Sequence, residues 1–309
     1  MAQKDVKSRI SSVKNIQKIT RAMEMVAAAR LRRAEQRIEA LRPYASAIRR
    51  MTRQAAEAAQ NVPNLPILQE HENVSNVGIL LVTGDRGLAG AFNSQIVRAG
   101  IRAGVEYEGS GKSTVWYASG RRGVSSLTFR GRTVAGEYTG FTDRPSYANA
   151  RDIAADLMTA YIDGDVDQVD IFYNRYISPL TQEVTRETLL PLQHATIFEG
   201  SSDEDSLGGR AGSDEDGERH EGPRALVEYE PDPEAILQRL VPAYVEISIY
   251  RALLESTASE HGARMTAMRN ASENASDLVK DLTLQMNRER QAEITQEIME
   301  VVAGAESLT

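Results

Sequence analysis

The first sixty residues carry apolar side chains at helical spacing. Apolar residues recur three or four positions apart, which places them on one stripe of an α-helix. This stripe consists of Val6, Ile10, Val13, Ile16, Ile19, Met23 and Val26. Steps of four and three then alternate regularly, as in the 3.5-residue repeat of a coiled-coil seam. This seam consists of Ala27, Leu31, Ala34, Ile38, Leu41, Ala45, Ile48, Thr52, Ala55 and Ala59. The seam stays in phase past Pro43, so we expect a bend there and a continuous helix.

A second heptad pattern fills the C-terminal part of the chain, residues 233–304. Its seam consists of Leu237, Leu240, Tyr244, Ile247, Arg251, Leu254, Ala258, His261, Met265, Met268, Ser272, Ala275, Val279, Leu282 and Met286. Such a helix is about 105 Å long at 1.5 Å per residue. Neither helix can bury its stripe alone, so we predict a long antiparallel coiled coil of the N- and C-terminal helices. Because the second helix is longer, its last turns should project from the pair or lie against another protein.

Between the two helices the period changes to that of a small α/β domain. The run 77–82 is almost wholly apolar and is typical of a buried strand, followed by a Gly-rich turn and a helix capped by Asn93 or Ser94. Further elements are expected as strands at 114–118 and 132–138, a helix at 146–162, and strands at 169–177 and 183–189. Strands alternating with helices predict a mostly parallel, Rossmann-like sheet covered by helices.

The sequence therefore divides into five parts. We expect an N-terminal coiled-coil helix at 1–60, a linker at 61–76, the α/β domain at 77–195, an acidic loop and connector at 196–232, and a C-terminal coiled-coil helix at 233–305. Charge differs sharply between these parts. Residues 1–60 hold 14 Lys and Arg against 5 Asp and Glu, a net charge of +9, whereas residues 201–222 have a net charge of -6 and almost no apolar content. That acidic tract is predicted to be disordered.

Composition excludes several classes of protein. The chain has 309 residues, a net charge of -8 and no Cys, which rules out disulfides, thiolate metal sites and a Cys nucleophile. No apolar run approaches the roughly 20 residues of a membrane-spanning helix, and the charged start differs from a secretory signal. A soluble, intracellular protein is expected.

Two glycine-containing segments superficially suggest ligand sites. The string GSGKST at 109–114 lacks the first glycine of a phosphate-binding loop, because Glu106 stands there, and a helix precedes it while a strand follows. It is interpreted as a surface turn. The turn at 84–90 sits where doubly wound folds bind phosphates, but its glycine spacing is not the dinucleotide fingerprint, so a tight backbone turn is favoured over a ligand site.

Other candidate chemistry is equally weak. Asp163, Asp165 and Asp167 imitate the start of a calcium loop, but Gln168 and Asn174 replace its required Gly and Glu. The four His residues, His71, His194, His220 and His261, are dispersed without an evident nucleophile or metal partner. His261 falls on the heptad seam, where a packed interface residue is expected, and Arg251 in the same seam is expected to set its register. No catalytic site, cofactor or metal site is predicted.

Three segments resemble the gamma subunit family of F-type ATP synthases. They are RISSVKNIQKITRAMEMVAAARLRRA (9–34), TGDRGLAGAFN (83–93), and the end of the chain from residue 259 to residue 305. The resemblance covers nearly the whole chain in the right order. It is most specific at the terminal signature of Ile294, Thr295, Glu297, Glu300, Gly304, Ala305 and Ser307.

The resemblance implies a non-catalytic rotor shaft that transmits torque between a membrane c ring and a catalytic hexamer of alpha and beta subunits. Its other implied partner is the epsilon subunit, and its implied location is the cytoplasmic face of a bacterial cell membrane, as a peripheral protein of a proton-translocating complex. By similarity, Arg290, Gln291 and Thr295 match the positions that meet an acidic catch loop of the beta subunit. Met23 matches the position on the neighbouring helix that faces them.

Simpler interpretations stay open for these residues. Met23, Met265 and Met268 could serve seam packing alone, and Arg290 could be an ordinary exposed helical charge. The cationic first helix also suggests a basic coiled-coil nucleic-acid-binding protein, although that function leaves the α/β domain without a purpose. An enzyme built on the α/β domain is a third possibility, opposed by the lack of a paired base and nucleophile.

Overall fold

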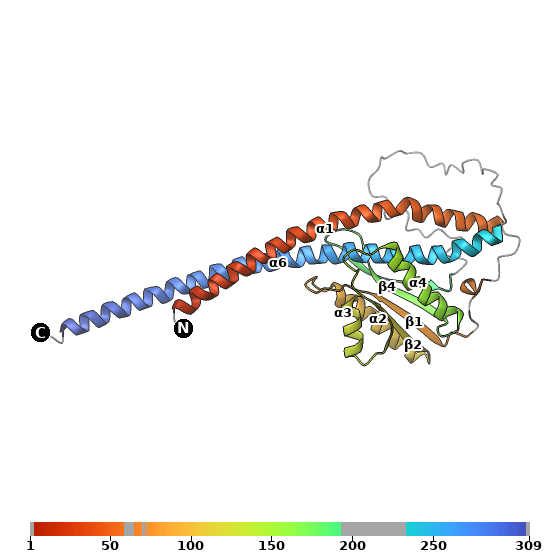
Figure 1. Ribbon diagram of the computed structural model, residues 1–309. Helices are drawn as coiled ribbons and strands as arrows, with labels where there is room; N and C mark the ends of the chain where they lie inside the picture. Colours follow the sequence, from red (N-terminus) through yellow and green to blue (C-terminus); the bar gives the residue numbers. More distant parts are fainter. Residues whose placement is uncertain (1–2, 59–64, 70, 72, 193–232, 307–309) are drawn as a thin grey trace, which may run out of the picture.

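Two long helices lie side by side and carry a small α/β domain at one end (Figure 1). The computed structural model describes residues 3–58, 65–69, 71, 73–192 and 233–306. Helix α1 (Gln3–Ala58) runs antiparallel to helix α6 (Pro233–Glu306), whose last part extends beyond the start of α1. The predicted helix pair and its projecting end are thus confirmed, while the acidic tract at 201–222 lies outside the described residues. Each helix continues through its internal proline, Pro43 or Pro242.

Most of the predicted α1 seam is buried between Ala27 and Ala55, with Ile38 and Leu41 half-buried and Ala59 outside the described residues, but the apolar stripe predicted before it is partly wrong. Ile16, Ile19 and Val26 are more than half exposed, whereas Thr20 is buried. The predicted steps from residue 13 to residue 26 are 3, 3, 4 and 3, one residue short of two heptads. An apolar stripe with a repeat shorter than the heptad moves gradually around the helix, so its side chains turn away from the partner helix α6. The side chains of Ile16, Ile19 and Val26 are therefore available on the surface of α1.

The domain contains a five-stranded sheet. Its strands are β1 (Asn76–Val82), β2 (Ser113–Ser119), β3 (Val134–Tyr138), β4 (Gln168–Tyr176) and β5 (Gln182–Leu190), in the order β3-β2-β1-β4-β5. All neighbouring pairs are parallel except β4 and β5, which are antiparallel. This confirms the expected mostly parallel sheet.

Among the described residues, three α-helices and one short 3-10 helix complete the domain. They are α2 (Phe92–Gly109), α3 (Arg121–Phe129), α4 (Tyr147–Ile162) and the 3-10 turn η1 (Pro66–Leu68). The sequence did not predict α3, which is short and includes Gly123. The cap of α2 also differs from the expectation, because the helix follows Ala91 and the Asn93 side chain accepts a hydrogen bond from the Gly84 amide at 2.8 Å.

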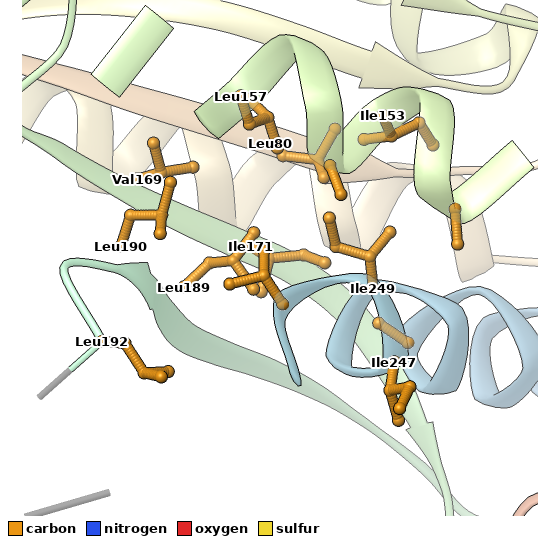
Figure 2. Packing of buried hydrophobic residues seen from close by; sticks show 14 of the residues in the cluster. Leu80, Ile153, Leu157, Val169, Ile171, Leu189, Leu190, Leu192, Ile247 and Ile249 are labelled. Carbon is orange, nitrogen blue, oxygen red and sulfur yellow. The ribbon is translucent and has the colours of Figure 1, made fainter. Parts of the chain in front are cut away.

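The long C-terminal helix forms part of the core of the α/β domain. Side chains alternate across β1, so Ile79 and Leu81 pack against α2, whereas Leu80 packs on the opposite face. On that face α4 and α6 both cover the sheet, and Ile249 of α6 lies among strand residues (Figure 2). The domain is therefore built onto the helix pair, and its glycine-rich loop end faces α6.

Candidate functional site

The projecting part of α6 exposes a helical surface with both apolar and charged side chains. Ile298, Met299 and Val301 are each more than half exposed. Arg290 is also exposed, and it forms no ion pair within the described part of the chain. Exposed apolar residues next to unpaired charge are typical of a surface that contacts another protein.

Two of the site residues expected from the sequence share one face of this projecting helix. Gln291 and Thr295 are four positions apart and exposed, and the Thr295 hydroxyl donates to the Gln291 carbonyl oxygen at 2.8 Å. With its hydroxyl hydrogen used inside the helix, Thr295 offers a methyl group and an oxygen acceptor to a partner. Arg290 lies beside them, so these three residues form one continuous surface.

Met23 is not level with that surface, which corrects the expectation that it faces Arg290. Glu24 forms an ion pair with Arg269 at 2.9 Å, which sets the register of the two helices. Met23 therefore lies opposite the region of Arg269. At 1.5 Å per residue that is about 30 Å along α6 from Arg290. The sequence could not give this register, because a heptad pattern is compatible with several.

Met23 instead lines a hollow of about 520 Å³ between α1 and the loop that follows β1. Its apolar wall includes Ile19 and Val26, the side chains that the seam leaves exposed, together with Leu88 of the loop. Four guanidinium-bearing residues also line it, namely Arg30, Arg86, Arg122 and Arg264. An apolar floor with a cationic rim suits a segment that carries both apolar and acidic side chains.

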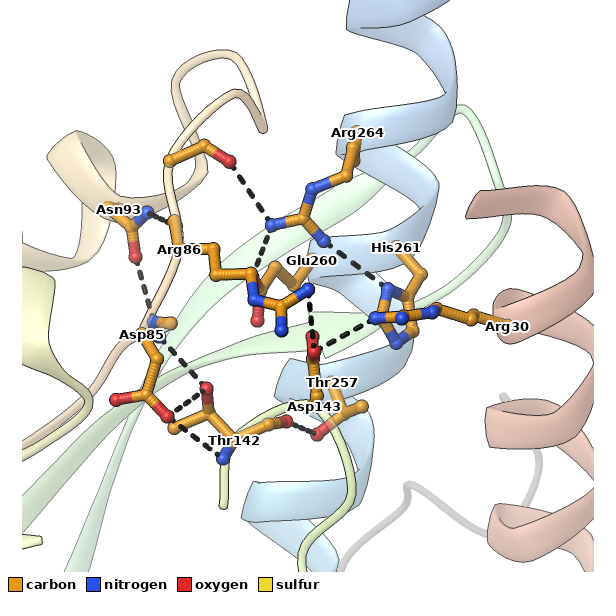
Figure 3. Close-up of polar contacts among 12 residues, drawn as sticks. Arg30, Asp85, Arg86, Asn93, Thr142, Asp143, Thr257, Glu260, His261 and Arg264 are labelled. Atoms are coloured by element: carbon orange, nitrogen blue, oxygen red, sulfur yellow. Dashed lines mark hydrogen bonds and ion pairs between the residues drawn. The ribbon is translucent and has the colours of Figure 1, made fainter. Parts of the chain in front are cut away.

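A buried ion pair fastens the β1–α2 loop to α6 (Figure 3). Arg264 donates to the Glu260 carboxylate at 2.5 Å and to the Gly87 carbonyl oxygen at 3.2 Å. Glu260 is 1% exposed, and burial raises the pKa of its carboxyl although Arg264 opposes that effect. Gly84 permits the close approach, because a Cβ there would lie 2.7 Å from the Glu260 carboxylate.

His261 sits beside this pair and is neutral. Its Nδ1 lies 3.4 Å from a guanidinium nitrogen of Arg264. Since Arg can only donate, Nδ1 is the acceptor and the ring proton is on Nε2. Burial, together with the charge of Arg264, lowers the pKa of His261 to about 4. The expected packed interface residue is observed, and its neighbours are arginines and the loop after β3.

Asp143 joins that loop to α1 and to the β1–α2 loop. Its carboxylate binds Arg30 of α1 at 2.8 Å and Arg86 at 3.3 Å, as Figure 3 shows. On the other side of the same loop, the Thr257 hydroxyl of α6 donates to the Thr142 carbonyl oxygen at 2.9 Å. Both long helices therefore hold the loop end of the α/β domain. Sequence spacing gave no sign of this network, whose members come from four separate segments.

Comparison with known proteins decides the family. A family model described as ATP synthase matches residues 2–308. The ATP synthase gamma chain of Rubrobacter xylanophilus is 41% identical over 305 residues, which cover 99% of this chain and 98% of the relative. That of Heliobacterium modesticaldum is 42% identical over 306 residues, which cover 99% of this chain and 98% of that relative. The chain belongs to the ATP synthase gamma chain family.

Solved structures agree with the fold of this gamma chain family member. A chain in the mitochondrial ATP synthase of Euglena gracilis, solved as OSCP/F1/c-ring, aligns with a TM-score of 0.66 at 18% identity, covering 99% of this chain and 94% of its own. A chain in the central stalk/c-ring structure of the Tetrahymena thermophila mitochondrial ATP synthase aligns with a TM-score of 0.58 at 27% identity. The alignment covers 82% of this chain and 99% of that chain. A gamma chain is a non-catalytic stalk subunit, and the comparisons lend no support to nucleic-acid binding.

One further expectation about this gamma chain is corrected by the structure. Arg251 pairs with Glu187 of β5 at 2.6 Å, and the Tyr173 hydroxyl donates to the same carboxylate. Arg251 thus holds the sheet on α6, and a role in setting the register with α1 is not supported. The heptad pattern could not separate these roles, because α6 is covered by α1 on one side and by the sheet on another.

None of the described helices combines the length and apolarity needed to cross a lipid bilayer.

Proposed function

We propose that this gamma chain is the central rotor shaft of a proton-translocating F-type ATP synthase. It transmits torque between a membrane c ring and the catalytic alpha/beta hexamer during ATP synthesis or hydrolysis, and it also binds the epsilon subunit. The shaft works as a peripheral protein at the cytoplasmic face of the bacterial membrane. The observation that carries the proposal is the antiparallel helix pair whose longer member projects with an unpaired, exposed surface.

Torque transmission requires a stiff and asymmetric shaft. Shared burial of α1, α6 and the sheet in one core provides stiffness. The domain on one side of the helix pair makes the surface different in each direction (Figure 1). Each orientation then presses a different neighbour of a surrounding ring, which shifts that neighbour between its conformations.

Two separate surfaces of the shaft would meet the beta subunits. We assign Arg290, Gln291 and Thr295 to the acidic catch loop, because an unpaired guanidinium forms charge-assisted hydrogen bonds with carboxylates. Met23 belongs to a second contact about 30 Å away along the shaft, where its hollow takes an acidic segment with apolar side chains. Screened charge of this kind attracts without fixing one geometry, so it permits release on rotation.

An Arg290→Ala variant tests the first contact. Losing a hydrogen bond to a charged group costs about 1.5 to 3 kcal/mol, so we expect ATP synthesis in membrane vesicles to be slower by at least roughly tenfold, with the complex still assembled. Arg288→Ala is the matched control, because Arg288 is equally exposed on the same helix. Normal synthesis with Arg290→Ala, or an equal loss with Arg288→Ala, would contradict the catch-loop contact.

A further inference from the structure

A second hollow lies along α1, between this helix and the loop that follows β3. It has a volume of about 320 Å³, and it is lined mainly by arginines, whereas the hollow at Met23 has an apolar wall. Arg30, Arg33 and Arg37 line it from one face of α1, where residues three and four apart are neighbours. Arg144 lines it from the loop.

The described residues do not balance the charge of this arginine cleft. Among the described residues, Asp143 is the one acidic residue that lines the cleft, and it is already bound to Arg30. Within the described ranges, Arg33, Arg37 and Arg144 form no ion pair. The described lining of the cleft therefore has a net charge of +3, because His261 in its wall is neutral at pH 7. Guanidinium groups gathered in one hollow repel each other unless an anion joins them.

An aromatic groove adjoins the arginine cleft. Arg37 lines both, and the groove, with a volume of about 400 Å³, is also lined by Tyr44, Tyr147 and Tyr250. Tyr147 and Tyr250 are in an edge-to-face contact with ring centroids 5.8 Å apart. Tyr44 is 51% exposed, so its ring is accessible to a ligand. Exposed tyrosine rings are surfaces on which a nucleobase can stack.

We propose that the arginine cleft binds a polyphosphate chain, with Arg33, Arg37 and Arg144 donating to phosphate oxygens. Guanidinium groups bind phosphate through paired hydrogen bonds, and three of them around one solvent-accessible hollow suit an anion with several oxygens. The volume is within the range of small-molecule sites. The same chemistry could come from inorganic polyphosphate or from a nucleoside polyphosphate, whose base would lie in the aromatic groove.

Titration calorimetry on the purified full chain, with tripolyphosphate and no divalent metal, tests the site. Each charge-assisted contact is worth about 1.5 to 3 kcal/mol, so the loss of two of them in Arg33→Gln/Arg37→Gln should weaken binding at least roughly 100-fold. The control is Arg32→Gln/Arg42→Gln, which removes the same charge from exposed positions of α1 that line neither hollow. It should change the affinity by less than about threefold, since screening weakens distant charges.

Comparison of ATP with tripolyphosphate identifies the source of the anion. Tighter binding of ATP, lost with Tyr44→Ala, assigns a nucleoside polyphosphate, and equal affinities assign inorganic polyphosphate. An Arg144→Gln variant should weaken binding in either case. The proposal fails if neither anion binds at millimolar concentration, or if both double variants lose affinity equally, which would indicate diffuse attraction to α1. It also fails if poly-aspartate binds the cleft and tripolyphosphate does not, since the cleft would then be a protein-docking surface.

Discussion

Replacing Arg264 by Met tests how the α/β domain is held on the shaft. The Arg264 side chain is 10% exposed and donates to Glu260 and to the Gly87 carbonyl oxygen. Methionine keeps much of the volume of the apolar stem but removes every donor. The variant therefore leaves the buried Glu260 side chain, which is itself 2% exposed, without its cationic partner.

The unpaired Glu260 carboxylate determines how much folding stability the variant loses. Breaking a buried ion pair by removing one partner destabilises a protein by about 3 to 5 kcal/mol, because the remaining charge is uncompensated. Removing both charges is far less costly. The double variant Glu260→Gln/Arg264→Met should therefore recover most of the loss, leaving a destabilisation of about 1 to 2 kcal/mol from the unmade hydrogen bonds.

The loss should also depend on pH. Burial already raises the pKa of Glu260, and without Arg264 the pKa rises further. Between the ordinary pKa and the raised one, the folded chain holds more protons than the unfolded chain, so stability falls as pH rises. The slope reaches about 1.4 kcal/mol per pH unit. The difference between wild type and Arg264→Met should consequently widen as the pH rises above the raised pKa of Glu260 in the wild type.

Urea unfolding followed by tryptophan fluorescence measures this directly. Trp116 is the only Trp, and it is buried in β2, so its emission reports on the α/β domain. Circular dichroism of the same samples reports on the two long helices. If the single and double variants are equally destabilised, or if the loss does not change with pH, the energetic account of the Glu260–Arg264 pair is wrong.

Three further changes have defined outcomes. Gly120→Ala should destabilise the domain by at least about 3 kcal/mol, since its Cβ would lie 2.2 Å from a backbone oxygen. Gly111 also has a positive φ but faces open space, so Gly111→Ala should cost only about 1 to 2 kcal/mol in the same urea assay. The pKa of His261 is lowered to about 4 from an ordinary value near 6.5, so protonation favours the unfolded chain as the pH falls. Between pH 7 and pH 4 the free energy of unfolding of the wild type should fall by up to about 3 kcal/mol relative to that of His261→Gln. Parallel pH dependence of the two unfolding free energies would contradict this. Glu24→Gln breaks a partly exposed pair and should cost under about 1 kcal/mol, a loss that vanishes in 1 M salt.

The elements of this fold were predictable where one physical signal dominated. The apolar run of β1 and the long heptads produced the right element types, because each buries a face against a single kind of neighbour. Prediction failed where a helix packs against two neighbours, or where the apolar period departs from the heptad. Arg251 lies on the heptad of α6 but faces β5, and Ile19 lies on an apolar stripe that drifts off the seam.

The functional surfaces were harder to predict than the fold. Arg290, Gln291 and Thr295 are neighbours along one helix, so sequence similarity alone groups them. Met23 was placed with them wrongly, because register between two helices is a tertiary property that an ion pair such as Glu24–Arg269 reveals only in three dimensions. The arginine cleft combines residues more than a hundred positions apart, so no local pattern could indicate it.

The junction between domain and shaft explains why polar residues are buried at that place. A hydrophobic contact alone is non-directional, so a domain held only by apolar packing can slide on a helix. Glu260 and Arg264 add bonds that exist in one geometry, and Asp143 ties the same loop end to the other helix. Buried charges contribute little to net stability, but breaking their geometry is costly. A shaft that carries torque needs that resistance to relative rotation, and a junction built this way supplies it on both helices at once.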